Sequence, residues 1–183
     1  MTAAVQELAD RGYDGTSLTR VAERAGVSKG LLWHYFAGKD DLMEATARAT
    51  IATVRDRIAA MLDLTQPVPD IIRAALRRAA ELSVTHRVEL RALNGIVHNL
   101  RRPDGTPRLT LDVYEETYRA QESLFRRGQA EGALRGFDTR VMAVTYQGAI
   151  DMMLAYLETN PDVDPERYAD ELAEILLVGI RRT

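Results

Sequence analysis

The sequence predicts an all-α protein of about nine helices. Apolar residues recur three and four positions apart along almost the whole chain, and no segment shows the apolar–polar alternation that a strand requires. Segments containing glycine and proline interrupt this pattern and divide the chain into pieces of helical length. The sequence contains neither an internal repeat nor a low-complexity tract. These observations indicate short N-terminal helices followed by longer ones.

The composition is that of an ordinary globular protein. Of the 183 residues, 46% are hydrophobic and 28% are charged, which is sufficient for a sizeable core. No apolar run approaches the roughly 18 residues that a membrane span needs, and no signal-peptide pattern opens the chain. Cysteine is absent, which excludes disulfides and thiolate metal sites and predicts a cytoplasmic protein. Because the formal net charge is -3, binding to nucleic acid would require a local basic face.

The most informative stretch, residues 19–36, predicts two short helices joined by a tight turn. Val21, Ala22 and Ala25 give the first helix an apolar stripe. Gly26 follows the last of them and can adopt the left-handed conformation that ends a helix. We expect Val27 to enter the core from this turn.

The second helix of the stretch begins after Ser28, whose side-chain oxygen can accept a hydrogen bond from a free N–H group. Leu32 and Phe36 are four residues apart and are expected to face inward. The segment from Ser28 to Lys39 also contains two lysines and one histidine but no acid, so its outer face is modestly basic. Two helices that cross at a glycine-containing turn and expose a basic N-terminal end form the helix-turn-helix unit that enters a DNA major groove.

Four linked segments carry a resemblance to a known family. They are residues 12–17, 21–28, 32–36 and 39–42, and they agree with the family in order and spacing. They resemble the N-terminal domain of the TetR (tetracycline-repressor-type) family of regulators, a match that covers about the first quarter of the chain. Leu31 stands where a threonine is common and Trp33 where a tyrosine is common, and both departures concern which bases are read.

The resemblance implies a helix-turn-helix DNA-binding domain at residues 1–40 and a helical ligand-binding and dimerisation domain at residues 41–183. In the family a basic arm precedes the first helix, whereas this sequence begins almost inside that helix. The expected DNA contacts are Thr16, Ser17, Arg20, Ser28, Lys29, Gly30, Leu31, Trp33, His34, Tyr35 and Lys39. By resemblance, Lys29, Gly30, Leu31 and Trp33 lie nearest the base edges. The alternative interpretation of these residues is a solvated helix face.

The remaining chain predicts six longer helices. The first is expected to start at Lys39 and end before Gln66. The other five are expected to span residues 70–83, 89–100, 109–131, 139–157 and 166–181. The first should face inward through Leu42, Ala45, Ala49 and Ala52. Asp40 or Asp41 is expected to cap it, and Asp138 to cap the helix that begins at Thr139.

The last two helices, 139–157 and 166–181, are apolar on more than one face. Gly148 and Gly179 lie inside them, although a glycine in a helix costs about 1 kcal/mol relative to alanine. A close approach by another helix would explain both glycines. The sequence therefore predicts a homodimer through these two helices, and the alternative is that they only complete the core of a monomer.

A ligand pocket is the second predicted site. The candidate residues are Arg91, Asn94, Tyr114, Tyr118, Asp151 and Met152, a few polar groups among apolar neighbours. The alternative is that they are core aromatic residues and surface charges. His86 and His98 lack metal-ligand spacing, and no catalytic constellation or phosphate-binding loop is present, so we expect no metal, no cofactor and no enzymatic activity.

Together these features predict a homodimeric transcriptional regulator, a repressor released from a near-palindromic double-stranded DNA operator by a small-molecule effector. One alternative is an all-α protein-interaction module or enzyme that retains the helix-turn-helix only as a packing element. Another is a regulator that responds to no small molecule, which a tightly filled interior would favour.

Overall fold

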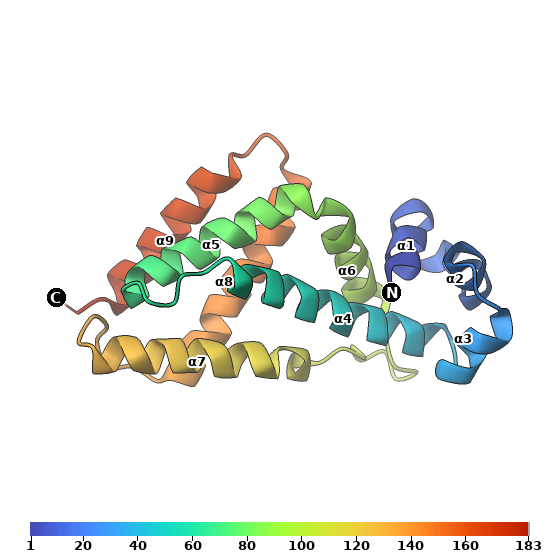
Figure 1. Cartoon of the computed structure of the whole chain (residues 1–183), viewed down its shortest axis with the longest axis horizontal. Coiled ribbons are helices and arrows are strands. Elements are labelled where there is room, and N and C mark those ends of the chain that lie inside the picture. The colour runs from blue at the N-terminus through green and yellow to red at the C-terminus, as the bar shows by residue number, and fades with distance from the viewer. Residues whose placement is uncertain (183) are drawn as a thin grey trace. The chain divides into compact units, whose positions relative to one another are not determined.

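The computed structural model describes residues 1–182. In this part of the chain it contains nine α-helices, one 3-10 helix (η1) and no strand, which confirms the all-α prediction. In chain order the elements in Figure 1 are α1 (Thr2–Gly15), α2 (Leu18–Ala25), α3 (Lys29–Tyr35), α4 (Lys39–Ala60), α5 (Val68–Thr85), α6 (Arg87–Asn99), η1 (Leu111–Tyr114), α7 (Glu115–Ala130), α8 (Thr139–Thr159) and α9 (Pro165–Ile180). Among these helices, none combines the length and the apolar character needed for crossing a membrane.

The helices group into two compact units. The first unit contains residues 1–53 and 86–113, and the second contains residues 54–85 and the chain from residue 114 onward. Helices α1, α2, α3 and α6 therefore belong to the first unit, and α5, α7, α8 and α9 to the second. The boundary falls inside α4. The predicted division at residue 40 separates a DNA-binding part from a ligand-binding and dimerisation part. It does not correspond to the boundary between the compact units, and it stays a prediction.

The core of the first unit joins α1, α2, α4 and α6. Its buried residues are Ala4, Val5, Leu8, Leu18, Val21, Leu42, Met43, Ala47, Ala92, Ile96 and Leu100. Leu32 and Phe36 pack against this cluster, as the sequence predicts. The prediction that Ala25 and Val27 face inward is wrong, because both are exposed. Helix α2 ends at Ala25, and the next residue, Gly26, turns the backbone with a φ of 68°.

The inward face of α4 differs from the predicted alanine stripe. Its buried residues are Leu42, Met43, Thr46, Ala47, Thr50 and Ile51, whereas Ala45, Ala49 and Ala52 are only half-buried. Thr46 and Thr50 are buried without loss because their hydroxyls donate to carbonyls one turn earlier, at 2.7 Å and 2.9 Å. A prediction from hydropathy alone misses these two threonines and therefore assigns the wrong residues to the inward face of the helix.

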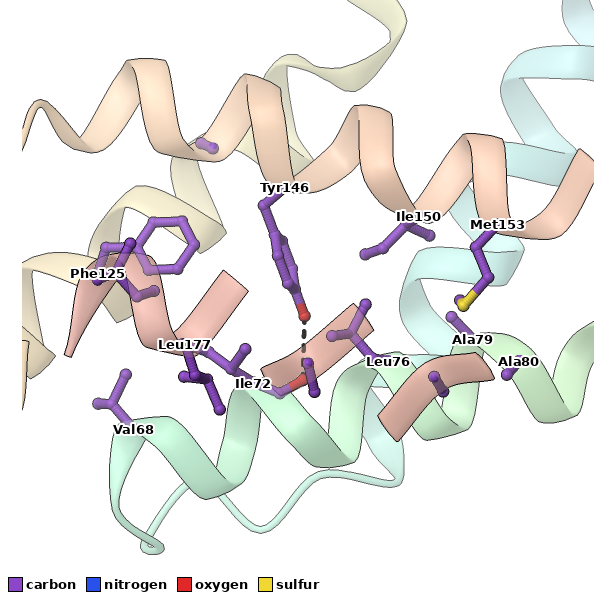
Figure 2. Packing of buried hydrophobic residues seen from close by; sticks show 14 of the residues in the cluster. Val68, Ile72, Leu76, Ala79, Ala80, Phe125, Tyr146, Ile150, Met153 and Leu177 are labelled. Atoms are coloured by element: carbon purple, nitrogen blue, oxygen red, sulfur yellow. Dashed lines mark hydrogen bonds between the residues drawn. The ribbon is translucent and has the colours of Figure 1, made fainter. Parts of the chain in front are cut away.

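The core of the second unit is built around α5, which packs against α7, α8 and α9. Figure 2 shows Tyr146 reaching from α8 toward α5, where its hydroxyl donates to the Ile72 carbonyl at 3.3 Å. Phe125 from α7 meets the Tyr146 ring edge-on, with 5.8 Å between the ring centroids. The buried residues of α5 confirm its predicted deep packing. The buried Tyr146 hydroxyl is hydrogen-bonded, and the other side chains of the cluster are apolar.

Several helix ends differ from the predicted bounds. Helix α5 begins at Val68, two residues earlier than predicted, because a proline at position 69 fits the first turn of a helix. The predicted helix 109–131 is divided into η1 and α7, so the α-helix itself starts only at Glu115. Asp138 caps α8 as predicted, and Pro165 occupies the first turn of α9. At α4, Asp41 lies in the first turn and accepts the Ala37 N–H at 3.1 Å.

The close packing of α7 gives a test of the second unit. A Cβ added at Gly128 would lie 2.7 Å from Leu134 and 2.9 Å from Val68, whose side chains are both buried and cannot move aside. We expect Gly128→Ala to lower the free energy of unfolding by about 1–3 kcal/mol, the usual effect of overpacking. Urea unfolding followed by circular dichroism measures this change.

Gly95→Ala is the matched control, since a Cβ at this position of α6 meets nothing within 4 Å. It should leave stability unchanged or raise it by up to about 1 kcal/mol through helix propensity. Equal unfolding curves for the two variants would contradict the packing described here.

Candidate nucleic-acid interface and ligand site

The turn between α2 and α3 is fixed by backbone hydrogen bonds and one side chain. The Gly26 N–H donates to the Glu23 carbonyl at 3.2 Å, and the Val27 N–H donates to the Ala22 carbonyl at 3.0 Å. Ser28 then caps α3, because its side-chain oxygen accepts the Leu31 N–H at 3.2 Å. These contacts set the angle at which α3 leaves α2, next to which it lies in Figure 1.

Helix α3 presents an open surface. None of its seven residues is buried. Leu31, Trp33 and Tyr35 are 44%, 56% and 70% exposed, although they are large and apolar or aromatic. His34 is also exposed and meets the Tyr35 ring edge-on, with 5.2 Å between centroids. A folded protein leaves such a face open where something else binds it.

The predicted base-reading residues lie together at the start of this surface. The Lys29 ammonium is exposed and lies 3.7 Å from a Glu23 carboxylate oxygen, a weak surface ion pair. A Cβ at Gly30 would meet nothing within 4 Å, so packing in the chain does not require glycine there. Lys29, Gly30, Leu31 and Trp33 can therefore approach a partner without rearrangement of the chain.

Two of the predicted phosphate contacts are occupied by contacts within the chain. Thr16 is 2% exposed and its hydroxyl donates to the Gly12 carbonyl at 2.8 Å, so the prediction that this side chain is available to a phosphate is wrong. Lys39 is half-buried: its ammonium donates to the Tyr13 carbonyl at 2.6 Å and lies 4.3 Å from the centre of the Tyr13 ring. Lys39 thus fixes the start of α4 to the end of α1.

The other predicted phosphate contacts remain accessible. Ser17 caps α2 by accepting the Arg20 N–H at 3.4 Å. The Arg20 guanidinium is exposed and donates to the Gly15 carbonyl at 3.3 Å, which leaves further N–H donors unused. Both residues lie near the N-terminal end of α2, where partial positive charge favours an anion.

The structure also contains a charged cluster that sequence reasoning missed. Glu7 on α1 is buried, and its carboxylate accepts the Arg24 Nε–H of α2 at 2.6 Å. A second N–H of Arg24 reaches Asp10 at 2.6 Å, and Arg11 lies 3.3 Å from Glu7. The hydrogen bond that Arg24 donates to Asp10 is the largest of the contacts that raise the pKa of Arg24. A glutamate within the apolar pattern of Val5 and Leu8 was the available signal.

The start of α4 is held by two arginines of the first unit. Arg108 donates to Glu44 at 2.8 Å and also hydrogen-bonds Asp41. Arg48 joins Glu44, at 3.1 Å, to Asp112, at 3.0 Å. The hydrogen bond from Arg108 holds the pKa of Glu44 below its ordinary value. The segment after α6 is therefore attached to the first three turns of α4.

Four of the predicted ligand residues lie in the second unit, and three of them form one polar site. Burial and then the charge of the nearby Asp151 carboxyl raise the pKa of Tyr114, and the Tyr118 ring lies 6.0 Å from the Tyr114 ring. Gln147 of α8 donates its amide N–H to Asp151 at 2.8 Å. Burial raises the pKa of Asp151, because the charged form loses solvation there, while the hydrogen bonds from Gln147 and Tyr114 act in the opposite direction.

The remaining ligand candidates are Met152 of the second unit and two residues of the first unit. Met152 is 67% exposed while the next residue, Met153, lies in the core, and the participation of Met152 in a ligand site stays a prediction. Arg91 and Asn94 lie on α6 in the first unit, apart from the unit that contains Asp151. Their participation in one pocket with the tyrosines stays a prediction.

A groove of about 620 Å³ lies elsewhere on the second unit, between α5 and the start of α9. Its arginines are engaged in ion pairs: Arg73 with Glu174, Arg77 with Asp170 at 2.6 Å, and Arg78 with Glu81 at 2.8 Å. This surface is charged and solvated, unlike the mostly apolar wall of a small-molecule site. Within residues 1–182, no group of three or more histidine, aspartate or glutamate side chains could hold a metal ion.

Comparison with known proteins relates the first part of the chain to a family of regulators. A family model described as bacterial regulatory proteins, tetR family, matches residues 1–46. The HTH-type transcriptional regulator BetI of Burkholderia cenocepacia (strain HI2424) is 42% identical over 66 residues, which are 33% of this chain and 34% of that protein. The chain thus matches the curated relatives over about a third of their length.

Solved structures extend the similarity to the whole chain. The transcriptional regulator FadR from Bacillus subtilis, in complex with stearoyl-CoA, has a TM-score of 0.70 at 18% identity and covers 98% of this chain and 97% of its own. A bacterial regulatory protein in the tetR family from Rhodococcus RHA1 has a TM-score of 0.68 at 19% identity and covers 96% and 92%. Similarity at this identity shows the fold, which is common to all of these chains.

The cluster at Glu7 gives a test of how the interface is supported. Arg24→Ala would leave a buried carboxylate with only Arg11 nearby, and removing one partner of a buried pair destabilises a protein. We expect a lower midpoint of urea unfolding for Arg24→Ala than for Arg20→Ala, which removes an exposed arginine from the same helix. Equal midpoints would show that the cluster does not stabilise the first unit.

Proposed function

We propose that this chain, a member of the TetR family of bacterial regulatory proteins, is a DNA-binding transcriptional regulator that acts as a homodimer and is released from its operator by a small molecule. The observation that carries the proposal is the open face of α3, whose start is capped and whose large side chains are exposed. A short helix presented in this way fits a DNA major groove.

The residues of α3 also suggest how bases are read. Lys29 can donate hydrogen bonds to guanine or to a phosphate, whereas the Leu31 side chain has no hydrogen-bonding group. An exposed leucine, 44% accessible, instead offers contact with the methyl group of thymine. We therefore expect a thymine in each half-site at the base pair beneath Leu31.

The alternative, a helix-turn-helix kept only as a packing element, fits the structure less well. A packing element would bury the residues of α3, and none of them is buried. The inward contacts of this region come from Leu32, which is half-buried, and from Phe36, which follows the helix. The outer face therefore contributes little to the stability of the chain, which favours a binding role.

The homodimer is supported by an apolar stripe on the second unit. Exposed residues of α8 and α9 form it: Val141, Val144, Gly148, Met152, Tyr156, Ile175, Val178 and Gly179. A Cβ at Gly148 or Gly179 would meet nothing within 4 Å, so the close approach predicted from the sequence does not occur inside one chain. A second copy packed on the same helices would bury the stripe and use both glycines.

Release by a ligand requires a connection between the two units. Helix α4 supplies Leu42 and Met43 to the core of the first unit and Ile58 to that of the second. We propose that a small molecule in the second unit shifts this helix and so changes the spacing of the two α3 helices. On a near-palindromic operator this spacing should be about one turn of DNA, roughly 34 Å, or somewhat more. The ligand can lower operator affinity only as far as it binds the DNA-incompetent conformation more tightly than the DNA-binding conformation.

The proposed DNA contact is tested by selecting bound duplexes from a random pool and measuring their affinity over a range of salt concentrations. Lys29→Ala should weaken operator binding and reduce the slope of log K against log salt by about one for each phosphate that the variant no longer neutralises. Arg102→Ala removes the same charge from an exposed loop of the first unit and should change neither value. Failure to select any sequence with the wild-type protein would reject the proposed function.

The proposed dimer is tested with Val178→Glu, which places a charge at a stripe residue that is 77% exposed in the single chain. Sedimentation equilibrium should give a wild-type mass twice the 20.4 kDa of one chain and a variant mass close to one chain. Leu111→Glu, an exposed apolar residue in the first unit, is the control and should remain dimeric. A monomeric wild-type protein would contradict the proposed interface.

A further inference from the structure

One group in the second unit is incomplete in a way that packing does not explain. Asp151 is a half-buried carboxyl that receives hydrogen bonds but has no opposite charge beside it. We propose that Asp151 binds the ammonium group of a small organic amine, and that this class of molecule is the effector. The regulatory part of this inference rests on the proposed function, whereas the binding part does not.

The hydrogen bonds at Asp151 suit a negative charge. The Gln147 amide donates to its carboxyl at 2.8 Å, and the neutral Tyr114 side chain is its other close polar neighbour. Neither partner is positively charged, and no ion pair of the described residues includes Asp151. Burial disfavours an isolated carboxylate and raises the pKa of Asp151, an effect that a bound cation would reverse. The site therefore supplies everything a carboxylate needs except a counter-charge.

A second acceptor nearby lacks a donor. Gln121 of α7 donates its amide N–H to the Gln147 side-chain oxygen at 2.9 Å. The other side-chain atom of Gln121, Oε1, is buried and has no hydrogen-bond partner in the structure. A buried acceptor without a partner is uncommon in a folded protein and marks a place where a donor is missing. Gln121, Gln147 and Asp151 form one connected chain of side chains, so both deficits belong to the same site.

The chemistry of the missing group follows from these two deficits. A primary ammonium carries three N–H donors and one positive charge, so it supplies both the donor that Gln121 lacks and the charge that Asp151 lacks. A neutral alcohol offers one donor and no charge, and a carboxylate or phosphate would be repelled by Asp151. Of these head groups, the ammonium supplies both the donor and the charge that the site lacks.

The neighbouring tyrosines fit the same class of ligand. Burial raises the pKa of Tyr114 and of Tyr118, so both remain neutral phenols. Neutral aromatic rings attract cations and also provide an apolar wall for the hydrocarbon part of an amine. Arg140 already lies 5.4 Å from the centre of the Tyr118 ring, but its charge is paired with Glu115 at 2.9 Å and Glu122 at 2.7 Å. It is therefore not the counter-charge of Asp151.

The test is isothermal titration calorimetry of the full chain at neutral pH, without DNA, using benzylamine as the probe. Benzyl alcohol and benzoate are the neutral and anionic probes of matched size. We expect benzylamine to bind at least about tenfold more tightly than either of them. Absent benzylamine binding, or equal binding of benzyl alcohol, would overturn the proposal.

Variants locate the binding site. Asp151→Asn keeps the size of the side chain and an acceptor oxygen but removes the charge, and it should weaken benzylamine binding by at least about tenfold. Gln121→Leu removes the unpaired acceptor and should also weaken it. Asp162→Asn, at an exposed loop position of the same unit, is the matched control and should bind as the wild type does. An Asp151→Asn protein that unfolds at the wild-type temperature and binds benzylamine unchanged would rule out this site.

The two proposals fail separately. Benzylamine should lower the operator affinity of the wild type but not of Asp151→Asn. A chain that binds benzylamine but selects no DNA would reject the regulator and keep the amine site. A chain that selects DNA but ignores benzylamine would reject the amine site and keep the regulator.

Discussion

The shortness of α3 is the constraint on which the candidate interface depends. An isolated helix of seven residues is not stable in water, and no residue of α3 is fully buried. Its conformation must therefore be imposed by its surroundings: by the Ser28 cap at its start and by Leu32 and Phe36, which pack against the core of the first unit. The outward side chains of α3 are not needed for folding and are therefore available to bind a partner.

The charged clusters of the first unit position α3 indirectly, by fixing the helices on either side of it. Arg24 fixes α2 to α1 through Glu7 and Asp10, and Arg108 fixes the start of α4 through Asp41 and Glu44. Because α3 is connected by short segments to α2 and to α4, the position of these two helices determines where α3 can lie. Partly buried arginine–carboxylate pairs are directional, so they fix the relative orientation of the helices that they join. Their net contribution to the free energy of folding is small by comparison.

Local patterns in the sequence predict local structure well here and side-chain environments less well. The helix-turn-helix, the Ser28 and Asp138 caps and the deep burial of α5 follow from residue types at short spacing. The buried Thr46 does not, because its burial depends on a hydrogen bond to its own helix that hydropathy ignores. Burial of Thr16 and the contacts of Lys39 also depend on residues far along the chain or on turn geometry, which spacing alone does not contain.

The second unit shows why periodicity cannot separate a core from an interface. Helices α8 and α9 are apolar on more than one face, and the sequence allows either interpretation of the extra face. In the structure one face is buried with α5 while the stripe through Val178 is open, and Asp151 likewise has donors but no counter-charge. Folding alone favours neither an uncovered apolar stripe nor an unpaired half-buried carboxyl. Departures of this kind concentrate where a protein binds something else, and the stripe and the carboxyl differ in what they lack: a second apolar surface in one case and a cation in the other.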